Sequence, residues 1–334
     1  MFTVHDLGLA ILFCVVTMLG WGSWANTQKL AGQDKWPFPL YYWDYAIGVL
    51  LFAVIAMFTL GSVGTSGQAA MANLGAADTG PIGRALFSGA IFNVSNILLV
   101  VAIDLAGMSV AFPVGVGLAL VIGTVASYAQ APKGNAPMLF AGVLLVVVAM
   151  VMSALAHRKL PRRAGEGWGR GVAYSVVAGC LMGFFYPQLS QAIAPGFNQG
   201  VIPPGALTPY TALLFFALGL VLSNFAVNTI FMRNAGLTYG NYFAGRAKLH
   251  SLGILGGLIW MLALSLNILA SGVAGPAISY ALGQGATLVA AVWGVFIWRE
   301  FKDAPQGTTP FIALMFAGYA AGLALIGMAT LGGN

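Results

Sequence analysis

The chain has 334 residues, of which 59% are hydrophobic and only 7% are charged, and its formal net charge is +6. Soluble domains have about a quarter of their residues charged, so the composition excludes a soluble enzyme or a nucleic-acid-binding domain. It predicts an all-α polytopic membrane protein, in which the excess of Lys and Arg marks one membrane face and not a nucleic-acid surface.

Apolar stretches of about 20 residues, bounded by Pro, Gly and charge clusters, predict the membrane spans. We expect ten spans, near residues 6–28, 39–61, 84–106, 108–129, 136–156, 170–193, 207–232, 249–271, 274–297 and 308–331. No Lys or Arg precedes the first apolar run, so this run is expected to be a retained span and not a cleaved signal peptide. Cys14 and Cys180 both lie in apolar runs, which favours buried thiols over a disulfide.

The distribution of basic residues predicts the orientation of these spans. Twelve of the fourteen fall in or beside the odd-numbered loops: Lys29, Lys35, Arg158, Lys159, Arg162, Arg163, Arg170, Arg233, Arg246, Lys248, Arg299 and Lys302. Only Arg84 and Lys133 lie toward the other face. Because cytoplasmic loops are enriched in Lys and Arg, we expect a protein of the cell (inner) membrane with both termini outside the cytoplasm.

A basic linker at residues 157–169 divides the chain into two halves of five spans, residues 1–156 and 170–334. Since five is odd, the second half enters the membrane with the opposite orientation. AGMSVAFPVGVGLALVIGTV (106–125) aligns with AGPAISYALGQGATLVAAVW (274–293), and Asn96-Ile97-Leu98 recurs at residues 267–269. The two halves are therefore predicted to be inverted five-helix repeats, the arrangement of many secondary transporters.

The first span ends in GWGSWANTQK (20–29), whose polar side chains lipid would penalise. Trp21 and Trp24 are three residues apart and so share a helix face, which makes them candidate stacking platforms for a ligand, with the amides of Asn26 and Gln28 nearby. A hydrated central cavity would explain a polar end of this kind.

Uncharged polar side chains also occupy the middle of other spans. Asn224 and Asn228 share one face at i, i+4, and Gln284 lies between two glycines that allow close approach of a ligand or a backbone. Hydrogen bonds between helices would explain such residues. A neutral polyhydroxyl or heterocyclic solute would explain them as well, because amides and aromatic rings bind such ligands and no basic residue lies at mid-depth. The expected substrate-binding residues are Trp21, Trp24, Asn26, Gln28, Asn93, Asn96, Tyr186, Gln188, Asn267, Tyr280 and Gln284.

Asp44 is the acidic residue placed furthest inside a predicted span, about six residues or roughly 9 Å from its cytoplasmic end. Ionised groups at this depth are costly and usually functional, so Asp44 is the candidate for proton coupling. The alternative is that Tyr41, Tyr42 and Trp43 form an interfacial belt and Asp44 reaches the headgroups. Asp104, at the turn between two spans, is expected to cap a helix or to lie at a solvated helix end. His250 is expected to mark a span boundary, with a proton relay as the alternative.

Chemical motifs narrow the functional class. The sequence has no HExxH, no GxSxG and no Walker A motif, and His5, His157 and His250 are far apart. We therefore expect no enzymatic activity, no metal site and no cofactor.

GMSVAFPVGVGLALVIGT (107–124) and LGQGATLVAAVWGVFIWREFKDA (282–304) resemble the paired helix signatures of the drug/metabolite transporter superfamily, in particular its glucose/ribose porters and L-rhamnose–proton symporters. The Trp-Gly-Ser-Trp of the first span, the Asp44-Tyr45 pair and LFAGV (139–143) are similar to the ureide permeases. The resemblance implies ten helices in inverted repeats, a central cavity, and uptake coupled to protons or another cation. We expect a proton-coupled importer of a small neutral polar solute, with a sugar first and a ureide or nucleobase second. A metabolite or drug exporter with proton antiport is the further alternative, and either a monomer or a homodimer could form the path.

Overall fold

The computed structural model describes residues 1–106, 108–160 and 167–331, without the side chains at 104, 108–110, 112, 113 and 168. Over these residues the chain is helical apart from turns and two isolated bridges, Ala77–Gly205 and Ile193–Leu207. The predicted all-α fold is therefore confirmed. The described part of the structure does not include Arg162, Arg163, the turn at Gly107 or the side chain of Asp104. The expectations for these residues stay predictions.

Nine helical segments in the described part of the chain are long and apolar enough to cross a membrane: Leu7–Gln33, Phe38–Phe58, Thr79–Ile103, Ala136–Arg158, Gly169–Ala192, Pro209–Asn234, Ala247–Ala274, Pro276–Ile297 and Thr309–Met328. These segments coincide with nine of the ten predicted spans. The tenth, 108–129, falls on α6 (Met108–Gln130), whose described apolar stretch is the shorter Val114–Gln130. The chain is a multi-span membrane protein by these criteria, and the count of ten stays a prediction.

The helices form two compact units, and the helices α5 (Thr79–Ala106) and α8 (Trp168–Ala192) contribute residues to both. Unit 1 comprises residues 1–93 and 188–273, and unit 2 comprises residues 94–187 and 274–334. Each unit draws on both halves of the sequence. The predicted inverted repeats are a division of the sequence at residues 157–169, whereas the two units are a division by contacts in space. The units therefore do not test the repeats, which stay a prediction.

Unit 1 contains most of the first three spans and the helices between α8 and α12. In chain order these elements are α1 (Leu7–Ser23), α2 (Ala25–Gln33), α3 (Phe38–Phe58), α4 (Ala70–Ala76), the start of α5, the end of α8, η1 (Phe197–Gln199), α9 (Pro209–Asn234), α10 (Tyr239–Phe243) and α11 (Ala247–Ala274). The N-terminal residues are held against the loop between α3 and α4, where the amino group of Met1 donates to the carbonyl of Ser66 at 2.8 Å.

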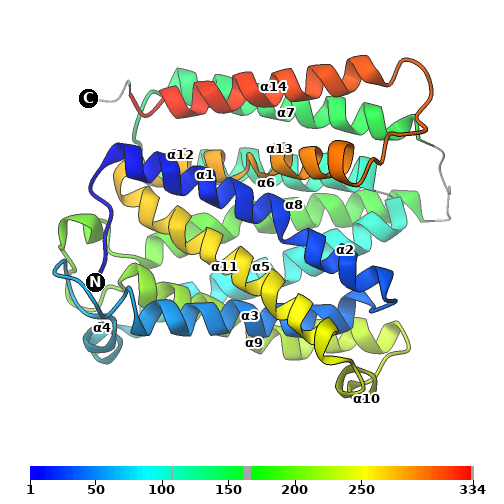
Figure 1. Ribbon diagram of the computed structural model, residues 1–334. Coiled ribbons are helices and arrows are strands. Elements are labelled where there is room, and N and C mark those ends of the chain that lie inside the picture. The colour runs from blue at the N-terminus through cyan, green and yellow to red at the C-terminus, as the bar shows by residue number, and fades with distance from the viewer. Residues whose placement is uncertain (107, 161–166, 332–334) are drawn as a thin grey trace. The chain divides into compact units, whose positions relative to one another are not determined.

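Within unit 1, α3 and α9 lie side by side in opposite directions (Figure 1). Near one end, the side-chain amide of Asn228 donates to the carbonyl of Pro39 at 2.9 Å. Near the other end, a Cβ placed on Gly61 would lie 2.8 Å from the ring of Tyr210. Helix α11 approaches α3 equally closely, because a Cβ on Gly257 would overlap the carbonyl oxygen of Tyr45. Small residues at such crossings let helix backbones approach within the membrane.

Unit 2 contains the end of α5, α6, α7 (Ala136–Arg158), most of α8, α12 (Pro276–Gly283), α13 (Ala286–Val292), the π-helical turn η2 (Trp293–Ile297) and α14 (Thr309–Met328). Helices α7 and α14 pack along their length (Figure 1). Their close approach depends on Gly142, where a Cβ would lie 2.7 Å from the carbonyl oxygen of Gly322. The apolar core of the unit is formed by residues such as Leu120, Leu139 and Ile278.

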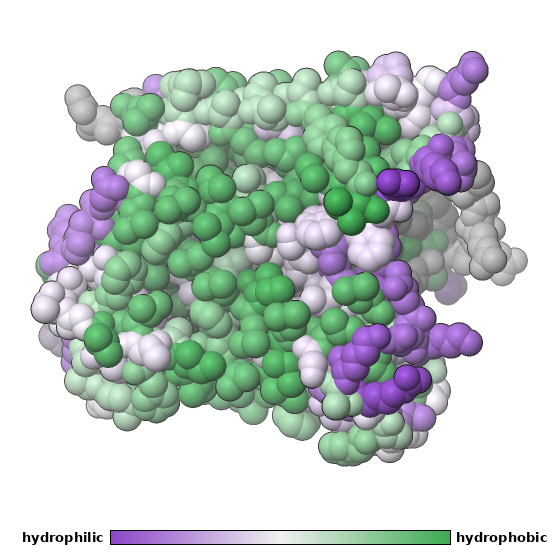
Figure 2. All heavy atoms as spheres, in the orientation of Figure 1, coloured by the Kyte–Doolittle hydropathy of each residue, from purple (hydrophilic) through white to green (hydrophobic). Residues whose placement is uncertain are grey.

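Charged residues gather at one end of unit 1. Lys248, at the start of α11, donates to Asp34, just after α2, at 2.8 Å. In the face shown in Figure 2, hydrophilic residues collect around α10 and the C-terminal end of α2. Arg84 lies near the start of α5 and bonds to Gln191. This arrangement within unit 1 follows the charge asymmetry of the sequence, while the direction in which the termini face stays a prediction.

Candidate functional site

A carboxylate, an imidazole and a phenol meet inside unit 1. The carboxylate belongs to Asp44 on α3 and is 1% exposed. The hydroxyl of Tyr242, on α10, donates to Asp44 Oδ1 at 2.7 Å. Nδ1 of His250, on α11, lies 2.9 Å from Oδ1 and 3.0 Å from Oδ2. We refer to these three residues as the Asp44 cluster.

Helix geometry explains why these three residues meet. Helix α3 begins at Phe38 after the extended residue Pro37, so Asp44 lies almost two turns inside it. Opposite Asp44 on α11 stands Gly253, where a Cβ would overlap the Cβ of Asp44. His250 precedes Gly253 by one turn on the same helix. The glycine therefore lets α11 come close enough for the imidazole to reach the carboxylate.

Helix α10 brings the third group. Its first residue follows Thr238, whose side chain and that of Asn241 form a reciprocal capping box. The helix is further held to α9 by a short hydrogen bond between the hydroxyls of Tyr239 and Thr229 (2.5 Å). Burial raises the pKa of the Tyr242 phenol, and the bond to Asp44 adds to the shift. The phenol therefore keeps its proton and remains a donor to Asp44.

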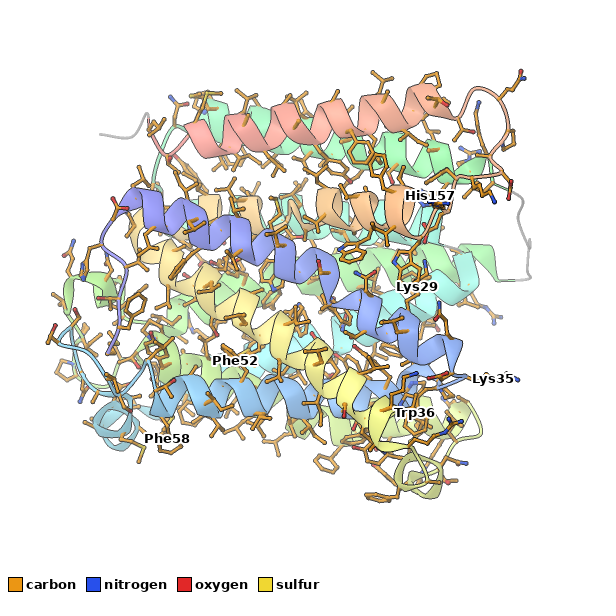
Figure 3. The ribbon with its side chains drawn as sticks, in the orientation of Figure 1. Lys29, Lys35, Trp36, Phe52, Phe58 and His157 are labelled. Atoms are coloured by element: carbon orange, nitrogen blue, oxygen red, sulfur yellow. The ribbon has the colours of Figure 1, made fainter. Side chains whose placement is uncertain are left out.

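His250 connects the buried carboxylate to the charged end of the unit. Its side chain is 24% exposed, against 2% for that of Asp44. Trp36 packs edge-on against the imidazole with ring centres 5.5 Å apart, beside the first turns of α11 (Figure 3). Nearby, the bond from Lys248 lowers the pKa of Asp34. The imidazole therefore lies between the buried carboxylate and the charged end of the unit.

An aromatic cluster fills the interior of the same unit, with Trp260 of α11 at its centre. The ring of Trp260 stacks on Trp21 of α1 at 6.0 Å and on Phe216 of α9 at 5.9 Å, and it contacts Phe92 of α5 at 4.2 Å. Tyr45 of α3 lies 6.3 Å from Trp260. Four helices therefore meet at one indole.

The predicted residues of the first span lie at the edge of this aromatic cluster. Trp21 donates from Nε1 to the carbonyl of Trp260 at 3.3 Å, and the ring of Trp24 lies 4.9 Å from that of Tyr45. Trp24 lies between the last residue of α1 and the first residue of α2. The amide of Asn26 donates to the carbonyl of Ser23 at 2.9 Å, within its own turn. Gln28 is half-buried on α2. Their role in binding a solute stays a prediction.

The other predicted residues are divided between the units. Unit 1 also holds Asn93, which donates to Ser223 Oγ at 3.0 Å, together with the half-buried Gln188 and the buried Asn267. Unit 2 holds Asn96, Tyr186, Tyr280 and Gln284. The rings of Tyr186 and Tyr280 lie 4.8 Å apart, and the hydroxyl of Tyr280 donates to the carbonyl of Ala119. Gln284 ends α12, so the helix is interrupted at the Gly-Gln-Gly sequence.

Sequence reasoning missed three residues of this arrangement. Tyr242 lies on a five-residue helix that gives no hydrophobic periodicity. For His250 the sequence favours a boundary residue over a proton relay and does not indicate Asp44 as its partner, because the two lie 206 residues apart. Trp260 resembles any aromatic residue in an apolar run. The spacing of His250 from Gly253, one helical turn, is the signal that could have indicated a side chain aimed at a close helix crossing.

Among the described residues, no group of three or more His, Cys, Asp and Glu side chains could hold a metal ion. His157 instead approaches Glu300 at 3.8 Å in unit 2, and His250 bonds to Asp44.

Comparisons with known proteins find similarity to the ureide permeases. A family model described as ureide permease matches residues 41–164, a stretch that contains Asp44. The chain is 22% identical to ureide permease 1 of Arabidopsis thaliana over 390 residues and 22% identical to ureide permease 2 of the same plant over 396 residues. Both alignments cover 98% of this chain and 98% of the relative. A crystal structure of another protein has a TM-score of 0.59 at 16% identity, covering 93% of this chain and 95% of that one, so the two chains have a similar fold.

Proposed function

We propose that the chain is a secondary-active permease of the ureide permease type. It imports a small neutral polar solute with an amide or urea group, and a proton gradient drives the import. The similarity to the two Arabidopsis ureide permeases over nearly the whole chain supports this class of solute. Of the two solutes considered from the sequence, a ureide or nucleobase therefore has more support than a sugar. The same relatives support a transporter and not an enzyme.

The Asp44 cluster is the observation that carries the proposal. A carboxylate is rarely placed within a membrane span without a function, because ionised groups in hydrocarbon are costly. Asp44 bonds to both an imidazole and a phenol, so a hydrogen-bonded route for a proton reaches the carboxylate. Binding of a proton to Asp44 removes the negative charge and changes the hydrogen bonds to Tyr242 and His250. Through these two bonds, protonation alters the packing of α3, α10 and α11.

The proposed location and orientation rest on the distribution of basic residues. The protein lies in the cell (inner) membrane, and the charged end of unit 1, with Lys35, Arg246 and Lys248, faces the cytoplasm because cytoplasmic loops are enriched in Lys and Arg. Both termini then lie outside. A monomer and a homodimer are equally compatible with this proposal.

Uptake into proteoliposomes tests the proposed function. Radiolabelled hydantoin, allantoin, uracil, glucose and rhamnose are offered with and without an inward proton gradient, and protein-free liposomes serve as the control. We expect the gradient to drive accumulation of at least one cyclic ureide or nucleobase and of neither sugar. Accumulation of a sugar alone would replace the proposed solute class, expulsion driven by the gradient would indicate an exporter, and no movement of any probe would refute the proposal.

A further inference from the structure

Unit 1 contains one buried asparagine whose hydrogen bonds are complete. Asn73 of α4 is 1% exposed, and its amide nitrogen donates to Gln68 Oε1 at 3.0 Å and to the carbonyl of Ala206 at 2.8 Å. Its amide oxygen accepts from the backbone N–H of Thr208 at 2.9 Å and from the hydroxyl of Thr211. The fold is therefore able to satisfy a buried amide in full.

Three other buried amides in the same unit are not satisfied in this way. Asn224 of α9 is 0% exposed, and neither its nitrogen nor its oxygen has a hydrogen-bond partner among the described residues. Asn228, one turn later, and Asn93 of α5 each use the nitrogen but leave the oxygen without a bond in the described structure. Buried polar groups are nearly always hydrogen-bonded, and each exception requires an explanation. The hydrocarbon core of the membrane offers no hydrogen-bond partner, because it has no hydrogen-bonding groups.

These amides lie on or against one stretch of α9, residues 223–228. Asn228 contacts Pro39 of α3, and Asn93 of α5 bonds to Ser223, which adjoins Asn224. Since α3 and α9 are antiparallel, Asn224 lies one turn further along α3 than Pro39, at the level where Trp43 packs against Phe225 at 4.9 Å. We refer to Asn93, Asn224 and Asn228 as the amide group.

Aromatic rings lie at the same level of α3. The ring of Tyr45 stacks on that of Tyr42 with centres 5.2 Å apart and planes 12° from parallel. The hydroxyl of Tyr45 is also buried without a partner in the part of the chain that the structure describes. Unit 1 thus combines flat apolar surfaces with unused donors and acceptors, which is the usual composition of a small-molecule site.

The chemistry of an unused carboxamide selects its partner. Its N–H donor and C=O acceptor lie side by side in one plane, so the complementary ligand presents an acceptor and a donor at the same spacing. Asn and Gln recognise adenine through such a pair of bonds. The N–H and C=O of a lactam or a cyclic urea have this geometry, whereas the separate hydroxyls of a sugar do not.

We propose that Asn224 binds the N–H/C=O edge of a planar neutral solute with two parallel hydrogen bonds, and that the free oxygens of Asn93 and Asn228 accept further N–H groups of the same molecule. This assignment rests on the proposed function and adds the residues that distinguish a cyclic ureide from a polyol. Asn224 is then a binding residue, while Asp44 carries the proton.

Equilibrium binding and uptake by purified wild-type protein and Asn224→Ala test the assignment. The probes are uracil and 1,3-dimethyluracil, which has the same ring without N–H donors. We expect the wild type to prefer uracil. In Asn224→Ala we expect the dissociation constant and the KM for uracil to rise about tenfold or more, corresponding to one or two hydrogen bonds, and the preference over the dimethyl analogue to fall. Asn224→Ala should melt at or above the wild-type temperature, because no bond of the empty protein is lost.

Asn73→Ala is the matched control. It removes a satisfied buried amide of the same unit, so it should lower the melting temperature and leave the preference for uracil unchanged. A folded Asn224→Ala protein with wild-type affinity and preference would overturn the amide group as the site, and so would a destabilised one whose preference is unchanged. Wild-type protein that binds uracil without gradient-driven uptake of any probe would contradict the proposed function alone. Wild-type protein that binds neither uracil nor its dimethyl analogue would overturn the assignment of Asn224, while uptake of hydantoin or allantoin would leave the proposed function standing.

Discussion

The close crossing of α3 and α11 allows the Asp44 cluster to be perturbed without changing any titratable group. In Gly253→Ala the added Cβ would overlap the Cβ of Asp44 and lie 3.0 Å from the carbonyl oxygen of Tyr41. Carbon atoms in contact are about 3.5–4.0 Å apart, so the two helices must separate by on the order of 1 Å. His250 and Asp44 are now 2.9 Å apart. The same shift would carry them beyond hydrogen-bond distance, which ends near 3.5 Å.

The size of the effect follows from two contributions. Overpacking of a well-packed core costs about 1–3 kcal/mol, and loss of a hydrogen bond to a charged group adds about 1.5–3 kcal/mol. We expect Gly253→Ala to lower the free energy of unfolding by roughly 2.5–6 kcal/mol on this basis, and to reduce gradient-driven uptake more than passive exchange. Thermal unfolding in detergent and paired uptake and exchange assays measure both effects.

Gly83→Ala provides the matched control, because this helical glycine of α5 has nothing within 4 Å of an added Cβ. The free energy of unfolding should rise by about 0.5–1 kcal/mol in Gly83→Ala, because alanine has less conformational entropy than glycine in the unfolded chain. If Gly253→Ala behaves like Gly83→Ala in stability and in uptake, the crossing does not hold Asp44 against His250, and the reasoning is refuted.

Three further predictions concern the rest of unit 1. Asn73→Ala should lower the free energy of unfolding by about 2–4 kcal/mol, because its lost partners stay buried, and a melting temperature equal to that of the wild type would contradict the network around α4. Tyr242→Phe should lower the melting temperature by the same amount at about pH 6 and about pH 8. The pKa of the Tyr242 phenol is raised, so the phenol stays protonated and its contribution to stability is lost only as the pH rises above the ordinary tyrosine pKa near 10. An effect confined to one of the two pH values would argue against donation to Asp44. In a background without Cys14 and Cys180, Lys35→Cys should react with an impermeant thiol reagent from the cytoplasmic side and Thr65→Cys from the outside; the reverse pattern would invert the proposed topology.

Sequence reasoning located the helices well because a membrane span needs a length and an apolar composition that can be read locally. It also located Asp44, since an acid inside such a stretch stands out from its neighbours. The partners of Asp44 could not be predicted in the same way. His250 and Tyr242 reach it only because α11 and α10 pack against α3, and packing between helices leaves no local pattern. Asn224 and Asn228 were visible as an i, i+4 pair, but their unused hydrogen-bonding capacity depends on which neighbours surround them.

The two tryptophans of the first span illustrate the same limit. Their spacing predicts a shared face, and the structure places Trp21 on Trp260 and Trp24 beside Tyr45. Whether a ring packs against the protein or awaits a ligand depends on residues far along the chain. For this reason the amides without partners are better indicators of a site in unit 1 than the rings.

The central claim is that protonation of Asp44 drives transport, and accumulation measured beside exchange in one preparation tests it most directly. Proteoliposomes containing wild-type protein or Asp44→Asn are loaded with uracil or hydantoin, whichever the wild type transports. Exchange of label at equal concentrations is compared with accumulation under an inward proton gradient. We predict that Asp44→Asn retains exchange and loses accumulation. An Asp44→Asn protein that concentrates the solute as the wild type does would contradict the account.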